Sequence, residues 1–416
     1  MSSVVNPSGS SDAELSMFQL LEPSVHANPY PFYARLRAEQ PVRWDPFMHT
    51  WVVSRYAEVL IVLQTFKADR TPSPTQLDAI GLPTMRPIAE LMSRQMLFLD
   101  APAHTGLRKL CSTALTPTRV GGLAGAIEQI ANDLLDALAG SDELDVIADF
   151  AEPFPAIVTA RLLGVPSEDH RQLKAWSADF AELLGNFQHN PDRQPAMLRS
   201  VADMVAYFRN AIERLKRTPI EGLILSLMNA EVEGERLSED DIIANTIVTM
   251  VGGQETTTNL IGNGLLTLIR QPEQMQRLRA DPSMMKTAVE ELLRFESPSQ
   301  HTARIAPADL VLGGCEIPKG AAVMAIMASA NRDEAQFADP DAIDLARREN
   351  RHLAFGWAAH FCFGAPLARL EGQIAFATIL RRFASLKLAT EQLEWRANLG
   401  LRGLKALPIH TTGGNR

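Results

Sequence analysis

Apolar residues recur three and four positions apart in six long stretches of the chain, which is the spacing of one face of an α-helix. These stretches span residues 122–138, 168–184, 197–215, 238–270, 282–294 and 366–383. A short helix is predicted within NPYPFYARLRAEQ, and strands are predicted in TWVVS at 50–54 and over residues 309–327. The pattern therefore predicts a mainly α fold with a minor β part.

The stretch 238–270 predicts the longest helix. Ser238 is followed by three acidic residues, which supply an N-cap and an acidic first turn, and Gln271-Pro272 ends the helix. At 1.5 Å per residue such a helix is about 50 Å long, enough to cross a whole domain. Because it is also largely apolar, we expect it to run through the core.

The domain organisation follows from composition more than from length. A chain of 416 residues on its own predicts about two to four domains. No stretch resembles a linker, however, because Pro and Gly are scattered and helical patterns resume within a few residues of each cluster. We therefore expect one domain over residues 28–416, preceded by a polar, mobile segment over residues 1–27.

Cysteine usage, hydropathy and charge exclude several classes of protein. Three cysteines without a CxxC pair argue against a disulfide framework or a structural zinc site, and indicate a reducing compartment. No apolar run approaches the roughly 18 to 20 residues that span a bilayer, and the N-terminus lacks the pattern of a signal peptide. A net charge of −9 offers no basic footprint for nucleic acid or an anionic membrane. We expect a cytoplasmic, monomeric protein that binds neither.

The pair Gly252-Gly253 lies inside the longest predicted helix, where each glycine costs about 1 kcal/mol relative to alanine. One explanation is a close contact between two helices. The other is that the missing side chains let a flat ligand approach the backbone. In that case Glu255 and Thr256 would face the same cavity, with the threonine hydroxyl bonded to a carbonyl one turn back.

Cys362 stands just before a predicted helix whose first turn contains Pro366. The helix dipole and nearby N–H groups would favour the thiolate form, and a thiolate is a good soft ligand for iron. A lone cysteine in an apolar setting is more often buried and unreactive. That explanation suits Cys111 and Cys315, which have no such surroundings.

The segment FGWAAHFCFGAPLARLE around Cys362 resembles the haem-binding segment of the cytochrome P450 family, in its bacterial soluble form. Eight further segments resemble family segments in the family order. They are NPYPFYARLR, DAPAHTGLRKL, GGQETT, EELLR, HTARIA, IPKGAAV, ANRDEAQFADPDAIDLAR and RGLKALPI. The resemblance covers almost the whole chain, and it implies a single-domain P450 fold with haem b between the long helix and the helix that follows the cysteine loop.

The resemblance implies roles for individual residues. Cys362 would be the axial thiolate ligand of the iron, with Phe355 packed near its sulfur and Gly252 leaving room for the haem. His104, Arg108, Arg304 and His360 would bind the haem propionates, because two carboxylates buried beside a macrocycle need charged donors. Glu291 and Arg294, three apart on one helical face, would form a structural ion pair completed by Arg347.

Glu255 and Thr256 match the acid–alcohol pair of the oxygen-binding helix. Cleaving the O–O bond of dioxygen requires two protons, delivered in a pocket that excludes bulk water. Thr256 would hold the hydrogen-bond network at the oxygen, and Glu255 would relay protons from solvent. Val248, Gln300 and His301, together with residues 71–96 and 180–197, would face a medium to large, mostly apolar substrate such as a polyketide, terpenoid, fatty acid or peptide product.

The chain departs from the family pattern close to the cysteine. Ala358 stands where the family usually has glycine, in a tight turn that requires an unusual backbone angle. Trp357 and Phe363 are bulkier than the common choices, and such neighbours alter the shielding of the sulfur and hence its redox potential.

The implied function is a haem-thiolate monooxygenase that inserts one atom of dioxygen into a small to medium apolar substrate. A peroxide-driven peroxygenase, an isomerase or dehydratase of the same fold, and a non-enzymatic haem sensor are the alternatives, and none of them requires the Glu255–Thr256 pair. No nucleotide-binding motif or iron–sulfur ligand set is present, so a ferredoxin and its reductase would supply the electrons. A positive patch of Arg108, Lys109, Arg347, Arg348 and Arg351 would receive the acidic donor.

Overall fold

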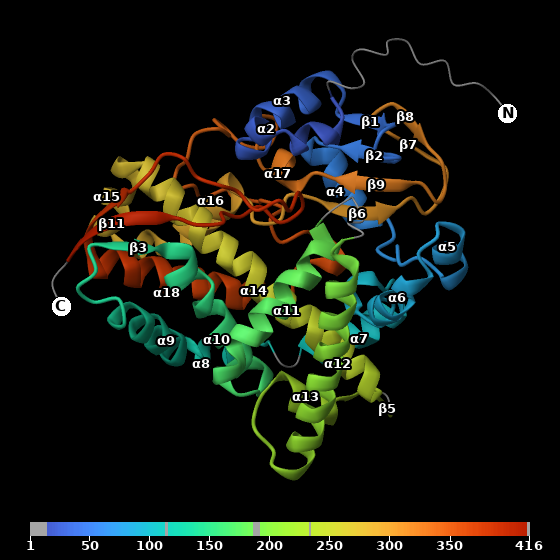
Figure 1. Cartoon of the computed structure of the whole chain (residues 1–416). Helices are drawn as coiled ribbons and strands as arrows, with labels where there is room; N and C mark the ends of the chain where they lie inside the picture. The colour runs from blue at the N-terminus through green and yellow to red at the C-terminus, as the bar shows by residue number, and fades with distance from the viewer. Residues whose placement is uncertain (1–14, 113–114, 186–191, 233, 414–416) are drawn as a thin grey trace.

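The computed structural model describes residues 15–112, 115–185, 192–232 and 234–413, which form one domain (Figure 1). The helices are α2 Pro23–Ala27, α3 Tyr30–Glu39, α4 Tyr56–Thr65, α5 Pro74–Ala79, α6 Arg86–Met92, α7 Ala103–Ser112, α8 Pro117–Gly122, α9 Ala124–Asp136, α10 Pro153–Leu163, α11 His170–Gly185, α12 Gln194–Arg217, α13 Leu223–Asn229, α14 Glu239–Arg270, α15 Pro272–Ala280, α16 Met285–Phe295, α17 Met327–Ala330 and α18 Ala365–Arg382. The strands are β1 Val42–Asp45, β2 Thr50–Val53, β3 Glu143–Asp145, β4 Glu231–Val232, β5 Glu235–Arg236, β6 Thr302–Ile305, β7 Leu310–Leu312, β8 Cys315–Ile317, β9 Ala322–Ala325, β10 Phe383–Leu388 and β11 Pro408–Gly413. The expected mainly α fold with a minor β part is confirmed.

The long helix α14 begins and ends where the sequence predicts. The Ser238 hydroxyl accepts a hydrogen bond from the backbone N–H of Asp241, and the Asp241 side chain accepts one from the backbone N–H of Ser238, which forms a capping box. α14 packs against α10, α11, α12, α16 and α18, and its side chains are buried on almost every side over residues 242–268. A helix buried all round is a core helix, as expected.

All six predicted helices are present, and no end differs from its predicted position by more than three residues. The helix α10 was not predicted, although it contacts α14 closely. The three-stranded sheet in the order β10-β11-β3 was also missed. Its strands come from residues near 144, 385 and 410, so no local pattern indicates that they pair.

A four-stranded sheet in the order β1-β2-β9-β6 lies beside the helical part of the molecule (Figure 1). β2 and β9 are parallel, with Trp51 opposite Val323, and β6 runs antiparallel to β9, with Arg304 opposite Val323. This pairing brings the N-terminal strands next to the segment that carries His301 and Arg304.

The expectation of a mobile segment over residues 1–27 is wrong for residues 15–27; residues 1–14 lie outside the described residues. A 3₁₀ helix at Met17–Leu21 and the helix α2 fold against the sheet, and Leu15, Met17 and Leu20 are at most 2% exposed. The Asp45 carboxylate accepts hydrogen bonds from the Ser16 hydroxyl and the Met17 N–H. The sequence predicts mobility because the few apolar residues of this segment follow a polar start. Only the fold shows that these apolar residues are buried and hold the segment in place.

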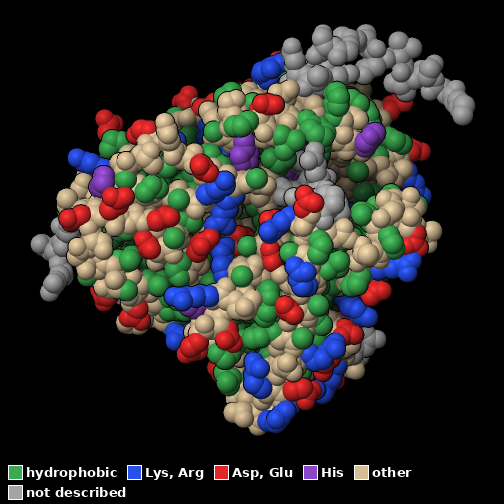
Figure 2. Space-filling model, viewed as in Figure 1, with side chains coloured by type: hydrophobic (Ala, Val, Ile, Leu, Met, Phe, Trp, Pro, Cys, Tyr) green, Lys and Arg blue, Asp and Glu red, His purple; other side chains and the backbone are tan. Residues whose placement is uncertain are grey.

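Within the described ranges, no helix is both long and apolar enough to cross a membrane. Acidic and basic side chains are interspersed over the face shown in Figure 2, with no large area of one sign. The net negative charge of the chain is therefore not gathered on this face.

Candidate active site

The loop that carries Cys362 is tied back on itself before α18 begins. The backbone N–H of Cys362 donates to the carbonyl of Phe355 at 2.8 Å, and the N–H of Ala365 donates to the carbonyl of Cys362 at 3.3 Å. Gly356 and Ala358 turn the chain with positive φ angles of 68° and 55°. The sulfur is thus presented at the N-terminus of α18 by a closed loop.

Two opposing effects act on the Cys362 thiol. Burial is the larger and raises its pKa, whereas the backbone N–H groups of Gly364 and Ala365 and the charges of Arg108 and Arg369 lower it. The expected N–H groups are therefore present, but burial outweighs them in the protein alone. A thiolate here needs the positive charge of a metal as well.

Ala358 adopts the left-handed backbone conformation that the family pattern assigns to glycine, with φ at 55°. For an L-residue this conformation costs roughly 1–2 kcal/mol. The side chain is exposed, so no steric contact adds to that cost. The chain therefore accepts backbone strain at this turn.

The two glycines of α14 have different roles. A Cβ atom on Gly252 would meet no atom within 4 Å, so this side of the helix faces open space. A Cβ atom on Gly253 would lie 3.0 Å from the hydroxyl oxygen of Thr159 on α10. The helix-contact explanation therefore holds for Gly253, whereas the ligand explanation stays a prediction for Gly252, which faces open space.

Thr256 lies one turn after Gly252 and on the same face of α14. Its hydroxyl donates to the Gly252 carbonyl at 2.6 Å, as expected. Val248 lies one turn before Gly252, so the three residues follow one line along the helix, four positions apart. This line is the side of α14 that offers open space.

Glu255 points away from that line into a network of ion pairs. The ammonium of Lys174 on α11 donates to Oε1 of Glu255 at 2.6 Å, and the guanidinium of Arg396 donates to Oε2 at 3.2 Å. Arg396 also pairs with Glu152. The exposed fraction of the side chain rises from 6% at Glu255 through 23% at Arg396 to 33% at Glu152, so the network leads from the interior to solvent. The sequence analysis missed Lys174 and Arg396.

His104, Arg304 and His360 gather beside the cysteine loop. The imidazole rings of His104 and His360 lie 4.1 Å apart. The Arg304 guanidinium donates only to Thr302 and to the carbonyl of Ala303, and its buried Nε, like Nε2 of His104, has no hydrogen-bond partner among the described residues. Burial lowers the pKa of Arg304 to about 10 and that of His360 to about 3; His104 and Arg304 lower the latter further. Buried donors without acceptors indicate a site for an anion.

Arg108 lies near this group, but part of its guanidinium is already used. Nη2 donates to the carbonyl of Phe361 at 2.6 Å, and the guanidinium lies 5.6 Å from the ring centroid of Phe363. The bulky Phe363 therefore packs beside a cation. Arg108 ties α7 to the cysteine loop and still contributes a positive charge there.

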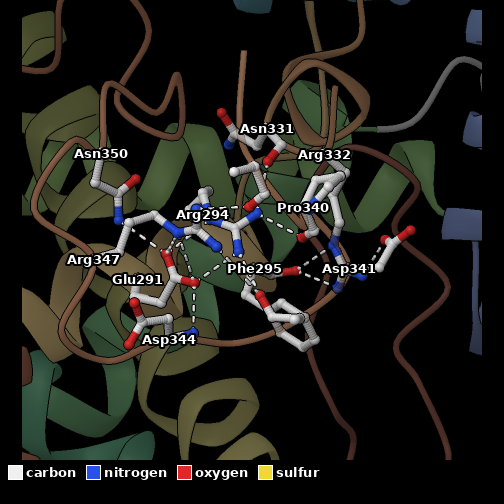
Figure 3. Close-up of polar contacts among 12 residues, drawn as sticks. Glu291, Arg294, Phe295, Asn331, Arg332, Pro340, Asp341, Asp344, Arg347 and Asn350 are labelled. Atoms are coloured by element: carbon white, nitrogen blue, oxygen red, sulfur yellow. Dashed lines mark hydrogen bonds and ion pairs between the residues drawn. The ribbon is translucent and has the colours of Figure 1, made fainter. Parts of the chain in front are cut away.

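Glu291 and Arg294 form a bidentate ion pair on α16, and both side chains are fully buried. Arg347 adds a second guanidinium, whose Nε lies 3.1 Å from Oε2 of Glu291. The remaining N–H groups of Arg294 donate to the carbonyls of Asn331 and Pro340, as Figure 3 shows, and to the carbonyl of Ala342. All the donors of this guanidinium are used. The cluster holds the segment that leads to the cysteine loop.

Glu290, one residue earlier, ties together both sides of the cysteine loop, and the sequence analysis assigned it no role. Its carboxylate accepts from Arg369 on α18 at 2.6 and 2.8 Å and pairs with His352 at 3.1 Å. Burial opposes its ionisation, but the hydrogen bonds from His352 and Arg369 outweigh burial and lower the pKa of Glu290 to about 2. The Arg369 guanidinium also lies 4.6 Å from the Phe355 ring centroid.

The two candidate substrate residues after α16 differ. Gln300 is buried at 2% exposure, its amide oxygen accepts from the Tyr33 hydroxyl, and its amide nitrogen donates to the carbonyl of Ser297. Both ends of this amide serve the scaffold, so the expectation that Gln300 faces a substrate does not hold. His301 is desolvated, which lowers its pKa to about 3, with a further contribution from Arg70.

The expected positive patch is only partly available. Arg108 and Arg347 are engaged with Phe361 and Glu291. Lys109, Arg348 and Arg351 are exposed, and the Arg351 guanidinium lies 5.6 Å from the Trp357 ring centroid. These three remain the exposed cations of the patch.

Fold and site together define a haem-thiolate enzyme, and comparison with known proteins agrees. Residues 84–401 match the family model described as "Cytochrome P450". The chain is 38% identical over 386 residues to the "Biotin biosynthesis cytochrome P450" of Bacillus subtilis (strain 168), covering 92% of this chain and 96% of that protein. It is 35% identical to the "Polyketide biosynthesis cytochrome P450 PksS" of the same organism, covering 95% of this chain and 99% of that protein.

A solved structure of P450BioI in complex with hexadec-9Z-enoic acid ligated acyl carrier protein superposes with a TM-score of 0.88, at 35% identity and covering 94% of this chain and 100% of that chain. The chain belongs to the cytochrome P450 family. It is a P450 monooxygenase, and its cofactor is haem b.

The residues at the site fit that cofactor. The unpartnered donors of His104 and Arg304 suit its carboxylates, and the open side of α14 at Gly252 suits its flat macrocycle. Cys362 would offer a thiolate ligand to the iron.

Proposed function

We propose that this P450 hydroxylates or epoxidises an extended, largely apolar acyl chain. One atom of dioxygen enters the substrate, and the other leaves as water with two protons and two electrons. Haem supplies the iron that binds and activates dioxygen. Cys362 is the proposed thiolate ligand, and His104, Arg108, Arg304 and His360 are the proposed propionate partners.

The arrangement of Glu255 and Thr256 favours dioxygen chemistry over its alternatives. Thr256 places a hydroxyl on the open side of α14, and Glu255 connects through Arg396 to the half-exposed Glu152. Glu255 is the proposed relay of protons from solvent, and the hydroxyl of Thr256 is proposed to hold the hydrogen-bond network at the oxygen. A peroxygenase, an isomerase or a haem sensor needs no such route.

The proposed substrate class rests on two relatives and on one apolar residue of α14. One solved relative carries a hexadecenoic acid linked to acyl carrier protein, and another is named for polyketide biosynthesis. The apolar Val248 lies on the open line of α14, where a long alkyl segment would pass. His301, which is buried near Arg70, is the proposed polar contact in place of Gln300.

We propose a ferredoxin with its reductase as the electron source. The exposed Lys109, Arg348 and Arg351 suit an acidic donor, and such charges mainly raise the association rate. A cytoplasmic location is proposed as well, since all three cysteines are free thiols.

The deciding experiment traces the origin of the inserted oxygen. Holoprotein is incubated with ferredoxin, reductase, NADPH, catalase and hexadecanoic acid, either free or linked to acyl carrier protein, under ¹⁸O₂. One ¹⁸O atom per product molecule is expected from the wild type, and none from Cys362→Ala, which also loses the long-wavelength Soret band of the reduced carbon monoxide complex. Product that forms only when catalase is omitted would instead identify a peroxygenase. Absence of product from both acyl forms would overturn the substrate class.

A further inference from the structure

Arg70 lies between α4 and α5 and was not among the residues that the sequence singled out. Its guanidinium carbon lies 4.5 Å from the ring centroid of Phe98, which is only 2% exposed. Nη1 donates to the carbonyl of Ala68 at 2.8 Å. A cation is thus held against an apolar wall, with one hydrogen bond to a neutral group.

The surroundings of Arg70 make a positive charge energetically unfavourable at this position. Burial, and to a smaller extent the nearby positive charge of Arg304, lower the pKa of Arg70 to about 9, whereas Asp69 and Asp100 oppose the shift. Asp69 is exposed, and the carboxylate of Asp100 accepts instead from the N–H groups of Ala68 and Asp69, at 2.9 and 3.3 Å. Among the described residues, neither Arg70 nor Arg304 forms an ion pair with a carboxylate.

The charges at this side of the site do not balance within the protein. Arg70, Arg108 and Arg304 contribute three positive charges, and Asp100 contributes one negative charge. Burial keeps the nearby imidazole of His301 neutral, because it lowers the pKa of His301 to about 3. Two positive charges remain, and two haem propionates would neutralise them.

We propose that Arg70 binds a carboxylate lying between it and Arg304, and that this carboxylate is a haem propionate. Bridging by one anion explains why two guanidiniums share a desolvated site without an acidic residue between them. The planar fork of Arg70, fixed over Phe98, gives a carboxylate a defined direction of approach. The proposal rests on membership of the P450 family and is independent of which substrate the enzyme oxidises.

The test measures how fast haem leaves the substrate-free ferric holoprotein, by transfer to excess apomyoglobin. Arg70→Met removes the charge and the hydrogen bonds at nearly the same length, and Arg70→Lys keeps the charge without the fork. Lys67→Met is the matched control, because Lys67 is an exposed cation three residues earlier. We expect haem loss to accelerate about tenfold or more in Arg70→Met, by less in Arg70→Lys, and not at all in Lys67→Met.

The reduction potential provides a second readout. Removing a cation beside the haem disfavours the added electron, so Arg70→Met should have a lower potential than the wild type and Arg70→Lys should remain close to it. If Arg70→Met does not load haem, Arg70→Lys and Arg70→Gln carry the same comparison.

A different source of the carboxylate gives a different result. If haem loss and potential stay unchanged while the affinity for hexadecanoate falls and that for its methyl ester does not, the anion belongs to a substrate and the proposal is wrong. If the rate of haem loss, the reduction potential and the affinity for hexadecanoate all stay unchanged, Arg70 binds no carboxylate and the proposal is also wrong. Neither outcome affects the ¹⁸O₂ experiment, which measures the oxygenase activity itself.

Discussion

Two buried clusters of charge in this molecule differ in whether their donors find acceptors within the protein. Around Glu291, the carboxylate and the guanidiniums of Arg294 and Arg347 satisfy one another and nearby carbonyls (Figure 3). Around Arg304, which is only 4% exposed, guanidinium and imidazole donors lack acceptors among the described residues. Similar residue types at similar depth thus form a closed cluster in one place and an open cluster in the other.

The difference separates scaffold from binding site. A closed cluster gains its whole stabilisation in the folded protein, so disrupting it acts on folding. An open cluster opposes folding until an anion arrives, and its stabilisation appears as binding energy for that anion. The predicted effects of substitutions in the two clusters therefore differ in kind as well as in size.

The largest effect is expected from Arg294→Met in the closed cluster. This change leaves the Glu291 carboxylate fully buried with one of its two cationic partners removed, and it takes the Arg294 donors from the carbonyls of Asn331 and Pro340. Breaking such a pair costs about 3–5 kcal/mol in the free energy of unfolding. Urea unfolding and the yield of haem-loaded protein measure it, with the exposed Arg348→Met as control. A loss below about 1 kcal/mol would contradict the assignment of this cluster to the scaffold.

Arg304→Met in the open cluster should weaken haem binding and leave the folding of the apoprotein intact. Losing one charge-assisted hydrogen bond costs about 1.5–3 kcal/mol, which is roughly a 10- to 100-fold rise in the haem dissociation constant. The apoprotein loses only an unpaired buried cation, so its stability should stay the same or rise. Haem titration and urea unfolding of the apoprotein separate the two quantities. Destabilisation of the apoprotein by several kcal/mol would place Arg304 with the scaffold instead.

The sequence predicted well what local patterns determine. The spacing of apolar residues located the long helices, and the neighbours of Cys362 marked its loop and the turn at Ala358. Two kinds of feature could not be predicted from the sequence, namely contacts between distant segments and the directions of side chains. Lys174 and Arg396 reach Glu255 from 81 and 141 residues away, and β3 pairs with β11 from a still more distant part of the chain. The direction of a side chain is also not local: Gln300 turns toward Tyr33, while its neighbour His301 lies beside Arg70.

Thr256→Ala tests a residue that belongs to neither cluster. Its hydroxyl bonds only to a carbonyl of its own helix, so folding and haem affinity should not change. Proton delivery should suffer: we expect product formed per dioxygen consumed to fall about tenfold, with hydrogen peroxide rising in its place. Oxygen uptake, peroxide release and product yield are measured together, with Thr256→Ser as the control that keeps a hydroxyl. Full coupling in Thr256→Ala would remove Thr256 from the proton route.

The smallest effect is expected at Ala358, where the cysteine loop carries backbone strain in place of unbalanced charge. Glycine would relieve roughly 1–2 kcal/mol of left-handed strain at φ 55° but would lose about 0.4–1 kcal/mol through greater freedom of the unfolded chain. Ala358→Gly should therefore stabilise the holoprotein by about 0.5–1 kcal/mol in urea unfolding. The neighbouring Ala359, whose φ is not positive, provides the control, because Ala359→Gly has no strain to relieve and should destabilise slightly. Equal changes in the free energy of unfolding at both positions would mean that the turn holds no strain. Alanine in place of the family's usual glycine at position 358 would then have no consequence for the loop that presents the cysteine.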